Sequence, residues 1–332
     1  MKILLYEPTY LRVWERVRQI VPHANPIILK QDGTLWEDGR QLDPRDHGFD
    51  VTYASPDLLV SGPPARQLIG LAMRSTSLDW FHFSAAGHEH PMMRAMIAKV
   101  PTFTRSDAMA PAIAEFVLAS VFQSFHPFEE RRAAQQNRRW ERLSFRDVQG
   151  SCWLVVGMGS IGRAVAERAH ALGARVLGVR RIPRGDEPVD EMVRAEELHL
   201  RLPEADVIVL CAPGSGDNTH LFNRSAFQVI KQGSVLVNIA RGNLIDESAL
   251  LEGLDREAPR VAVLDVFETE PLAESSPLWS HPRVRITAHC AGASKSVLPR
   301  SDELFLSNLR AYVDHRELHL VVSRGAAESP TQ

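Results

Sequence analysis

Short apolar runs alternate with longer amphipathic segments along almost the whole chain. In the first part, strands are expected at residues 3–6, 51–53, 58–61 and 80–84, and a long apolar helix at residues 111–125. Such alternation is typical of α/β folds built on parallel sheets. The pattern therefore predicts an α/β protein.

After Gly150 the alternation becomes tighter. Strands are expected at residues 152–156, 176–179, 206–211, 234–239, 260–264 and 283–287, and a helix at residues 161–172 that Gly173 ends. These six strands with their intervening helices and loops are enough for one complete doubly wound domain. An amphipathic helix at residues 304–312 and a strand-like segment at residues 318–322 follow.

The length of 332 residues exceeds that of one typical core and predicts two domains. The chain is 44% hydrophobic and 24% charged, as in ordinary globular proteins, and its net charge of −3 gives no basic field that would attract nucleic acid. The arginine-rich residues 129–146 also contain glutamates, so a solvated helix face and loop is expected there. We therefore expect no nucleic-acid partner.

Hydropathy and cysteine usage indicate the compartment. No apolar run approaches the ~20 residues that a membrane helix needs. The three cysteines, Cys152, Cys211 and Cys290, are scattered along the chain, which fits reduced thiols better than a disulfide framework. A cytoplasmic protein without a membrane partner is expected.

A glycine pattern lies near the start of the region after Gly150. It has the form G-x-G-x-x-G and stands directly between a predicted strand and a predicted helix. In that context the first glycine permits the turn, the second lets a pyrophosphate approach the backbone, and the third lets the helix pack on the strand. Helix N-termini attract phosphate through free N–H groups and a partial positive charge. The residues expected to bind a dinucleotide are Gly157, Met158, Gly159, Ser160, Ile161 and Gly162.

Two arginines follow the next predicted strand. Dinucleotide sites often carry an acidic residue there, about 20 residues after the glycines, to bind the adenosine ribose 2′-OH. Here Arg180 and Arg181 follow Val179, and no carboxylate occurs before Asp186. A guanidinium cannot accept a hydrogen bond from the 2′-OH, but it can bind a 2′-phosphate. NADP(H) is therefore expected over NAD(H); the alternative is a solvated loop and an unselective site.

Three polar residues follow later strands of the same region. Arg241 lies in the stretch NIARGN, Glu270 in DVFETEP and His289 in AHCAG. Ligands of open α/β sheets bind beyond the carboxyl ends of the strands, so these side chains are expected to meet beside the ligand. Either Glu270 or Glu268, two residues before it, could be the carboxylate that pairs with His289.

These stretches and the glycine pattern resemble the NAD(P)-dependent D-isomer-specific 2-hydroxyacid dehydrogenases in order and spacing. The resemblance is strong from about residue 104 to residue 293 and weak elsewhere, where residues 84–87 (Ser-Ala-Ala-Gly) chiefly carry it. It implies two lobes: a Rossmann-type nucleotide-binding domain at residues 104–293, inserted in a smaller flavodoxin-like α/β substrate domain formed by residues 1–103 and 294–332.

The resemblance also implies roles for single residues. Arg241 would bind the substrate carboxylate and polarise the 2-oxo group, and His289 would be the general acid in reduction, oriented by Glu270. Asp265 would accept a hydrogen bond from the nicotinamide carboxamide. The residues implied to border the dinucleotide are Pro213, Thr219, Ala240 and Gly292, and those implied to contact the substrate are Ala86, Gly87, His88 and Arg241.

Some positions depart from the family or remain open. Ala288 stands where members commonly have proline, and His88 and Glu89 stand where a hydrophobic residue and an acid commonly follow the glycine of the substrate loop. The run at residues 88–90, His-Glu-His, looks like a chelate but lacks a completing ligand set, so no metal is expected. Cys290 is expected to be a packing cysteine, because adjacent strand residues point to opposite faces.

The expected function is reduction of a small 2-oxo acid, such as glyoxylate or hydroxypyruvate, to the D-2-hydroxy acid with NADPH. A phosphite-oxidising member of the family and a nucleotide-sensing scaffold or co-repressor of the same fold are the alternatives. Formate oxidation is disfavoured, because it requires no acid to protonate a carbonyl oxygen, whereas this chain keeps the Glu–His acid pair. A homodimer is expected from the apolar helix at residues 111–125 with Trp140 nearby, and from the family's usual assembly.

Overall fold

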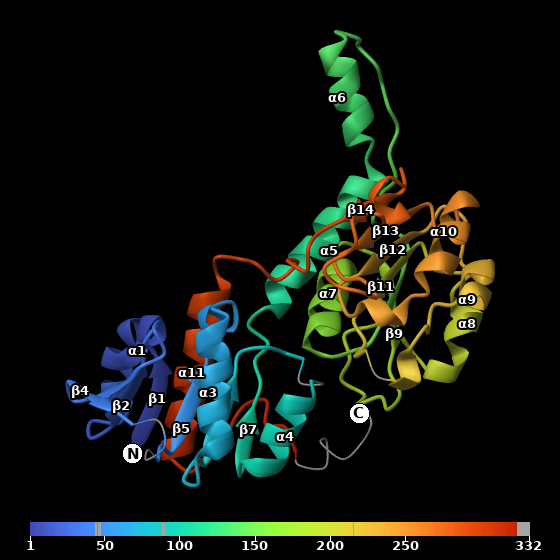
Figure 1. Cartoon of the computed structure of the whole chain (residues 1–332). Coiled ribbons are helices and arrows are strands. Elements are labelled where there is room, and N and C mark those ends of the chain that lie inside the picture. The colour runs from blue at the N-terminus through green and yellow to red at the C-terminus, as the bar shows by residue number, and fades with distance from the viewer. Residues whose placement is uncertain (44, 46–47, 88–89, 215, 324–332) are drawn as a thin grey trace. The chain divides into compact units, whose positions relative to one another are not determined.

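The computed structural model describes residues 1–43, 45, 48–87, 90–214 and 216–323 (Figure 1). The chain forms two compact units, Met1–Met109 with Ser294–Gln332, and Ala110–Ala293. The second unit is thus inserted between the two segments of the first. Each unit contains a seven-stranded sheet within the described residues, which confirms the expected α/β architecture with two lobes.

The sheet of the first unit has the strand order β4-β3-β2-β1-β5-β6-β7. Its parallel strands are β1 (Lys2–Tyr6), β2 (Asn25–Leu29), β5 (Val51–Ala54), β6 (Trp80–Phe83) and β7 (Thr102–Thr104). The strands β3 (Leu35–Glu37) and β4 (Arg40–Leu42) form an antiparallel hairpin at one edge. Counted along the chain, the parallel strands follow the order 2-1-3-4-5, which is flavodoxin-like.

Helices cover both faces of this sheet, because alternate residues of a buried strand point to opposite sides. Ile3 and Leu5 pack with α1 (Glu7–Ile20) and α11 (Val297–Val313). Leu4 and Tyr6 point to the other face, where α3 (Pro63–Arg74) and α4 (Pro91–Lys99) pack. The C-terminal helix therefore completes the core of the unit that the N-terminus begins.

A short helix, α2 (Pro56–Leu59), occupies part of the segment expected as a strand at residues 58–61. That expectation was wrong. Pro56 presets the backbone angle φ of a first helical turn, and Leu58 in this turn is buried. Apolar runs this short do not distinguish strand from helix.

The sheet of the second unit is all parallel, in the order β10-β9-β8-β11-β12-β13-β14. Its strands are β8 (Cys152–Val156), β9 (Arg175–Val179), β10 (Glu191–Val193), β11 (Val207–Leu210), β12 (Val235–Asn238), β13 (Val261–Leu264) and β14 (Val284–Ile286). This is the Rossmann order with one strand added at the edge. The sequence pattern missed β10, because only Val193 of its three residues is buried.

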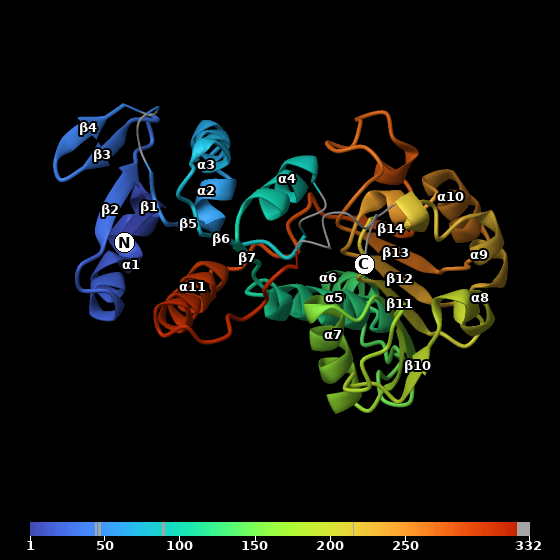
Figure 2. The ribbon, with the colours of Figure 1, turned by 90° about the horizontal axis from the view of Figure 1, so that it is seen from below.

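Two layers of helices enclose this sheet (Figure 2). On one face lie α5 (Ala110–Phe125) and α7 (Ser160–Ala171); on the other lie α8 (Leu198–Arg201), α9 (Arg224–Val229) and α10 (Glu247–Asp255). Leu154, Ile208 and Leu236 point from the strands into the core beneath α8, α9 and α10. The rigid sheet fixes the loops that leave its carboxyl edge.

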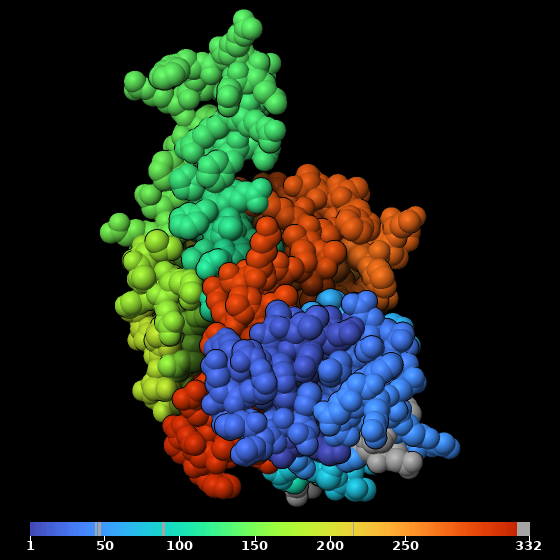
Figure 3. All heavy atoms as spheres, turned by 90° about the vertical axis from the view of Figure 1, so that its left-hand side faces the viewer, coloured from blue at the N-terminus to red at the C-terminus, as the bar shows by residue number. Residues whose placement is uncertain are grey.

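After α5, the helix α6 (Phe128–Gln136) and the segment that returns from it extend away from the rest of their unit (Figure 1). The space-filling view shows this green segment standing clear of the neighbouring atoms (Figure 3). His126 stacks on Phe145 with ring centroids 4.2 Å apart, and Arg146 forms an ion pair with Asp206 at 2.5 Å. These contacts brace the base of the projecting segment.

Within the described residues, no helix is both long and apolar enough to cross a membrane.

Candidate functional site

The glycine segment connects β8 to α7 with a backbone that few other residues would permit. Gly157 has φ of +101°, and a Cβ there would lie 2.6 Å from the backbone N of Ala212. A Cβ on Gly162 would lie 1.9 Å from the carbonyl oxygen of Gly157. A Cβ on Gly159 would instead enter open space, at the N-cap of α7. The segment therefore leaves a cradle at a helix N-terminus that suits a pyrophosphate.

Arg180 lies beside this cradle, directly after β9. Its Nη1 donates to the carbonyl oxygen of Met158 at 3.4 Å and lies 3.6 Å from Oε1 of Glu187. Arg181 lies farther out, with its Nη1 3.8 Å from Oδ2 of Asp217. The Arg180 guanidinium is thus held against the glycine segment, where the adenosine ribose of a dinucleotide is expected.

Arg241, Glu270 and His289 follow β12, β13 and β14, which are neighbouring parallel strands. The carboxyl ends of parallel strands meet at one edge of a sheet, so the three residues leave the sheet at the same edge. Gly242 brings two of these loops together, because a Cβ there would lie 1.8 Å from the carbonyl carbon of Phe267. The loop that carries Arg241 therefore packs directly on the loop that carries Glu270.

Glu270 and His289 form a hydrogen-bonded pair, with 2.8 Å between Oε2 and Nδ1. The other carboxylate oxygen of Glu270 accepts from the backbone N–H of Phe267 at 3.1 Å, which fixes its orientation. The histidine side chain is 56% exposed, so a ligand can reach its ring. The pair has the geometry of a general acid with a carboxylate that orients it.

The rival carboxylate, Glu268, is engaged elsewhere. Its Oε1 lies 3.0 Å from Nε2 of His220 and accepts from the backbone N–H of Glu247 at 3.3 Å. The structure thus brings His289 to Glu270 and gives Glu268 a different histidine.

Asp265 is buried at the end of β13 and organises the loop that carries His289. Its Oδ1 accepts from the hydroxyl of Thr287 at 2.6 Å and from the backbone N–H of Cys290 at 2.8 Å. Its Oδ2 accepts from the N–H of Ala291 at 3.0 Å. His289 itself has φ of +50° and donates its N–H to the carbonyl oxygen of Asp265 at 2.8 Å. These bonds hold His289 in a backbone conformation that L-residues seldom adopt.

This backbone overturns one expectation. Cys290 was expected to pack inside because it was placed on a strand, yet β14 ends at Ile286 and the thiol is exposed. The turn at His289 removes the strand alternation on which the expectation depended.

The other residues expected around the dinucleotide also lie in loops at the carboxyl edge. Pro213 and Thr219 follow β11, and the carbonyl oxygen of Pro213 accepts from Nδ2 of Asn218 at 3.0 Å. Ala240 is buried after β12, and its N–H donates to Oδ1 of Asn238 at 3.1 Å. Gly292 follows Ala291 in the loop that Asp265 holds. The sheet therefore gathers all of them on one side of the unit.

Ala86 and Gly87 belong to the first unit, in the loop after β6. The carbonyl oxygen of Ala86 accepts from Nη1 of Arg105 at 3.5 Å. His88 lies outside the described residues. His90 caps α4 by accepting from the N–H of Met92 at 3.2 Å, and no group of three potential metal ligands occurs in the described part of the chain.

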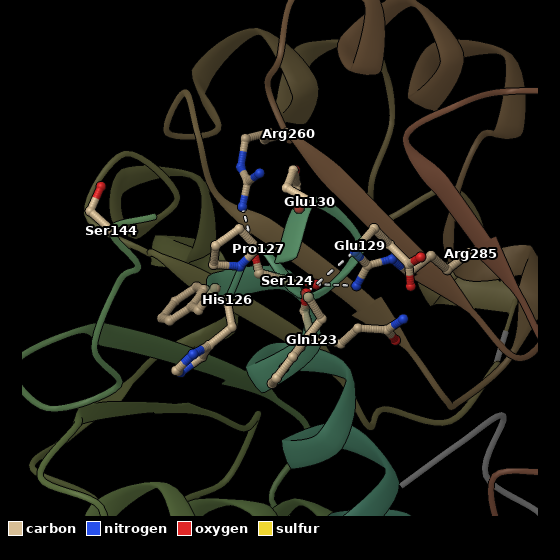
Figure 4. Close-up of a pocket in the computed structure, with 11 residues that line it drawn as sticks. Gln123, Ser124, His126, Pro127, Glu129, Glu130, Ser144, Arg260 and Arg285 are labelled. Atoms are coloured by element: carbon tan, nitrogen blue, oxygen red, sulfur yellow. Dashed lines mark hydrogen bonds between the residues drawn. The ribbon is translucent and has the colours of Figure 1, made fainter. Parts of the chain in front are cut away.

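A polar cavity of about 250 Å³, which no sequence pattern indicated, lies at the base of the projecting segment. It lies between the end of α5, the start of α6 and two arginines, and Figure 4 shows both guanidinium groups directed toward Ser124. Arg260 donates to the carbonyl oxygen of Ser124 at 2.5 Å, and Arg285 donates to its hydroxyl at 2.8 Å. Burial and the charge of Arg260 lower the pKa of Arg285. None of the expected site residues lines this cavity.

Comparison with known protein families identifies the family of this chain. Residues 118–291, more than half of the chain, match the family model of the D-isomer specific 2-hydroxyacid dehydrogenase, NAD binding domain. The chain belongs to the D-isomer specific 2-hydroxyacid dehydrogenase family. It is therefore an NAD(P)-dependent oxidoreductase of that family, as its motifs predicted.

Individual relatives of the dehydrogenase are distant but cover nearly the whole chain. Glyoxylate/hydroxypyruvate reductase A of Salmonella dublin is 28% identical over 305 residues, covering 89% of this chain and 90% of that protein. The protein of the same name from Citrobacter koseri is 28% identical over 298 residues, with 89% and 90% covered.

Solved structures of the family share the fold. A family protein from Aeromonas salmonicida superposes with a TM-score of 0.75 at 27% identity, covering 97% of this chain and 98% of that one. A dehydrogenase from Xanthobacter autotrophicus, in complex with NADPH and MES, has a TM-score of 0.75 at 23% identity, covering 98% and 99%. At that identity the second likeness concerns the fold alone.

Proposed function

We propose that this dehydrogenase reduces a small 2-oxo acid to the D-2-hydroxy acid, with NADPH preferred over NADH. The observation that carries the proposal is the 2.8 Å pair between Glu270 and His289 in a family dehydrogenase domain. The names of the glyoxylate/hydroxypyruvate reductase relatives make glyoxylate and hydroxypyruvate the first substrates to test.

The glycine segment fits a dinucleotide, because Gly159 leaves open space at the N-cap of α7 and Arg180 stands beside it. The residues that would hold the cofactor are those of the glycine segment, Arg180, Arg181, Pro213, Thr219, Ala240, Asp265 and Gly292. When bound, the nicotinamide supplies the hydride that reduces the 2-oxo carbon. Oδ2 of Asp265, which accepts one loop N–H, keeps a lone pair for the carboxamide.

The chain's own side chains would handle charge and protons. Arg241 would bind the substrate carboxylate with its planar fork and polarise the 2-oxo group. Because Glu270 holds Nδ1 of His289, Nε2 is the nitrogen that would donate a proton to the developing alkoxide. Glu270 would stabilise the protonated imidazole, and Ala86, Gly87 and His88 of the first unit would contact the substrate.

The preference for NADPH rests on the residues at the end of β9. Arg180 is held at the glycine segment by its hydrogen bond to the carbonyl oxygen of Met158 at 3.4 Å. A guanidinium in this place favours a 2′-phosphate over a 2′-OH.

We also propose a homodimer built on the second unit. Aromatic side chains of the projecting segment are exposed far more than is usual: Trp140 is 97%, Phe145 51% and Phe128 48% exposed. A projecting segment with such side chains suits a second copy, because exposed apolar patches mark association sites.

The experiment that tests the catalytic proposal is oxidation of NADPH measured over a panel of 2-oxo acids, with phosphite and NADP⁺ as the reverse assay. Turnover of glyoxylate or hydroxypyruvate supports the proposal. Turnover of phosphite alone would identify a phosphite-oxidising member, and cofactor binding without any turnover would favour the nucleotide-sensing scaffold.

A further inference from the structure

A carboxylate already lies against the arginine that would bind the 2′-phosphate. The side chain of Glu187 is only 1% exposed, and its Oε1 lies 3.6 Å from Nη1 of Arg180, whose side chain is 25% exposed. The same oxygen accepts from the N–H of Arg184 at 2.8 Å, and Oε2 accepts from the N–H of Gly185 at 2.9 Å. Residues 180–187 thus fold around a carboxylate that faces Arg180.

This carboxylate is negatively charged at neutral pH. Burial raises the pKa of Glu187, but the N–H bonds from Arg184 and Gly185 and the charge of Arg180 outweigh it, so the pKa lies below its ordinary value. An anion that carries full charge competes for a guanidinium with any phosphate that arrives there.

The neighbouring acidic residues have other partners. Asp186 binds Arg163, with Oδ1 accepting from Nη1 at 3.0 Å, and Asp217 lies 3.8 Å from Arg181. Glu187 is therefore the carboxylate that the described structure places at Arg180.

We propose that Glu187 is an internal counter-anion of the cofactor site, which pairs with Arg180 until a 2′-phosphate displaces it and so limits the preference for NADPH. The inference rests on the proposed function, since it deepens the assignment of Arg180. Glu187 acts on specificity through Arg180, not by contact with the reacting atoms.

The test is calorimetric titration with 2′,5′-ADP and with 5′-ADP, at one fixed ionic strength. We expect Glu187→Gln to bind 2′,5′-ADP about three- to fivefold more tightly, the size of a partly exposed ion pair, and to bind 5′-ADP unchanged. The gain fades as salt is added, because ions screen the attraction between Arg180, whose side chain is 25% exposed, and the incoming phosphate. Asp186→Asn, which removes the same charge one residue away, is the matched control and changes the ratio less than about twofold.

The outcomes separate the inference from the function on which it rests. Weaker or unchanged binding of 2′,5′-ADP by Glu187→Gln overturns the counter-anion, and so does an equal gain in Asp186→Asn. Loss of affinity for both nucleotides would show that Glu187 only folds the loop, and also overturns it. Neither probe contains nicotinamide or undergoes turnover, so failure to reduce any 2-oxo acid would refute the proposed function and leave this ratio standing.

Discussion

The carboxylate of Asp265 accepts from the hydroxyl of Thr287 at 2.6 Å, and the same oxygen accepts from the N–H of Cys290. The two contacts lie on either side of His289, whose backbone has φ of +50°. A carboxylate thus fixes the loop that positions the histidine, and the histidine ring then meets Glu270.

Removing the hydroxyl of Thr287 tests this positioning. We expect Thr287→Val to lower kcat for 2-oxo acid reduction about tenfold while leaving KM for NADPH within about twofold, because one hydrogen bond to a charged group is lost. Ser248→Ala, which removes a hydroxyl bonded to Asp246 at 2.6 Å, is the control. Steady-state kinetics measure both. A rise in KM for NADPH with kcat intact would mean that Asp265 acts mainly on the cofactor.

The proposed preference for NADPH depends on Arg180. A hydrogen bond to a charged group is worth roughly 1.5–3 kcal/mol, which corresponds to a preference for NADPH of about ten- to a hundredfold. We expect Arg180→Asp to remove this contact, repel the 2′-phosphate and shift kcat/KM toward NADH. Arg256→Asp, an exposed arginine after α10, is the control with the same charge change. Equal values for both cofactors in the wild type would show that the arginines are only solvated loop charges.

We expect the projecting segment to form the contact between the two copies of a homodimer. Light scattering at micromolar concentration should give twice the chain mass of 37.1 kDa. Trp140→Asp should shift the protein toward the monomer, because it places a charge in the apolar contact. Leu200→Asp, at a side chain 73% exposed on α8, should leave the mass unchanged. A wild-type mass of 37.1 kDa would exclude the dimer.

We expect His82 to make the stability of the first unit depend on pH. It is fully buried, its Nδ1 lies 2.7 Å from Oγ1 of Thr104, and burial lowers its pKa from 6.5 to about 3. The unfolded chain therefore binds a proton below pH 6.5 that the folded chain rejects down to pH 3. In this window the free energy of unfolding should fall by about 1.4 kcal/mol for each unit by which the pH is lowered.

The comparison with His82→Phe isolates this contribution, because the variant keeps a ring among Tyr53, Trp80 and Phe305 but cannot take up a proton. Urea unfolding from pH 6.5 to pH 4.5 gives the free energy of unfolding of both proteins. The wild type should lose stability more steeply than the variant; parallel curves would show that His82 does not contribute.

The sequence predicted the elements whose environment is uniform. Residues 152–156 are buried at every position, so their strand is visible as an apolar run. The edge strand β10 carries half-buried Glu191 and Met192, and the hairpin β3–β4 has few buried residues, so neither shows a clear period. The helix α1 was also not predicted, although Val13 and Val17 are buried four residues apart on one face.

Some features of the candidate site could also be predicted from the sequence, and others could not. That Arg241, Glu270 and His289 leave one sheet edge follows from the order of strands and could be predicted. Which carboxylate reaches His289 depends on loop geometry, and the competing contact between Glu268 and His220 has no sequence signal. The role of Glu187 also lies in a loop, where the spacing of charges along the chain does not give their distances.

In the proposed mechanism, Glu270 and His289 together supply the proton for 2-oxo acid reduction. The most direct measurement is the pH dependence of kcat in Glu270→Gln against Glu268→Gln, with NADPH binding measured in parallel. We expect Glu270→Gln to lower kcat about a hundredfold, within the range of general acid catalysis, to move the fall in rate to lower pH, and to leave NADPH binding intact. Glu268→Gln should resemble the wild type. The opposite result, a loss in Glu268→Gln with Glu270→Gln unaffected, would contradict the account.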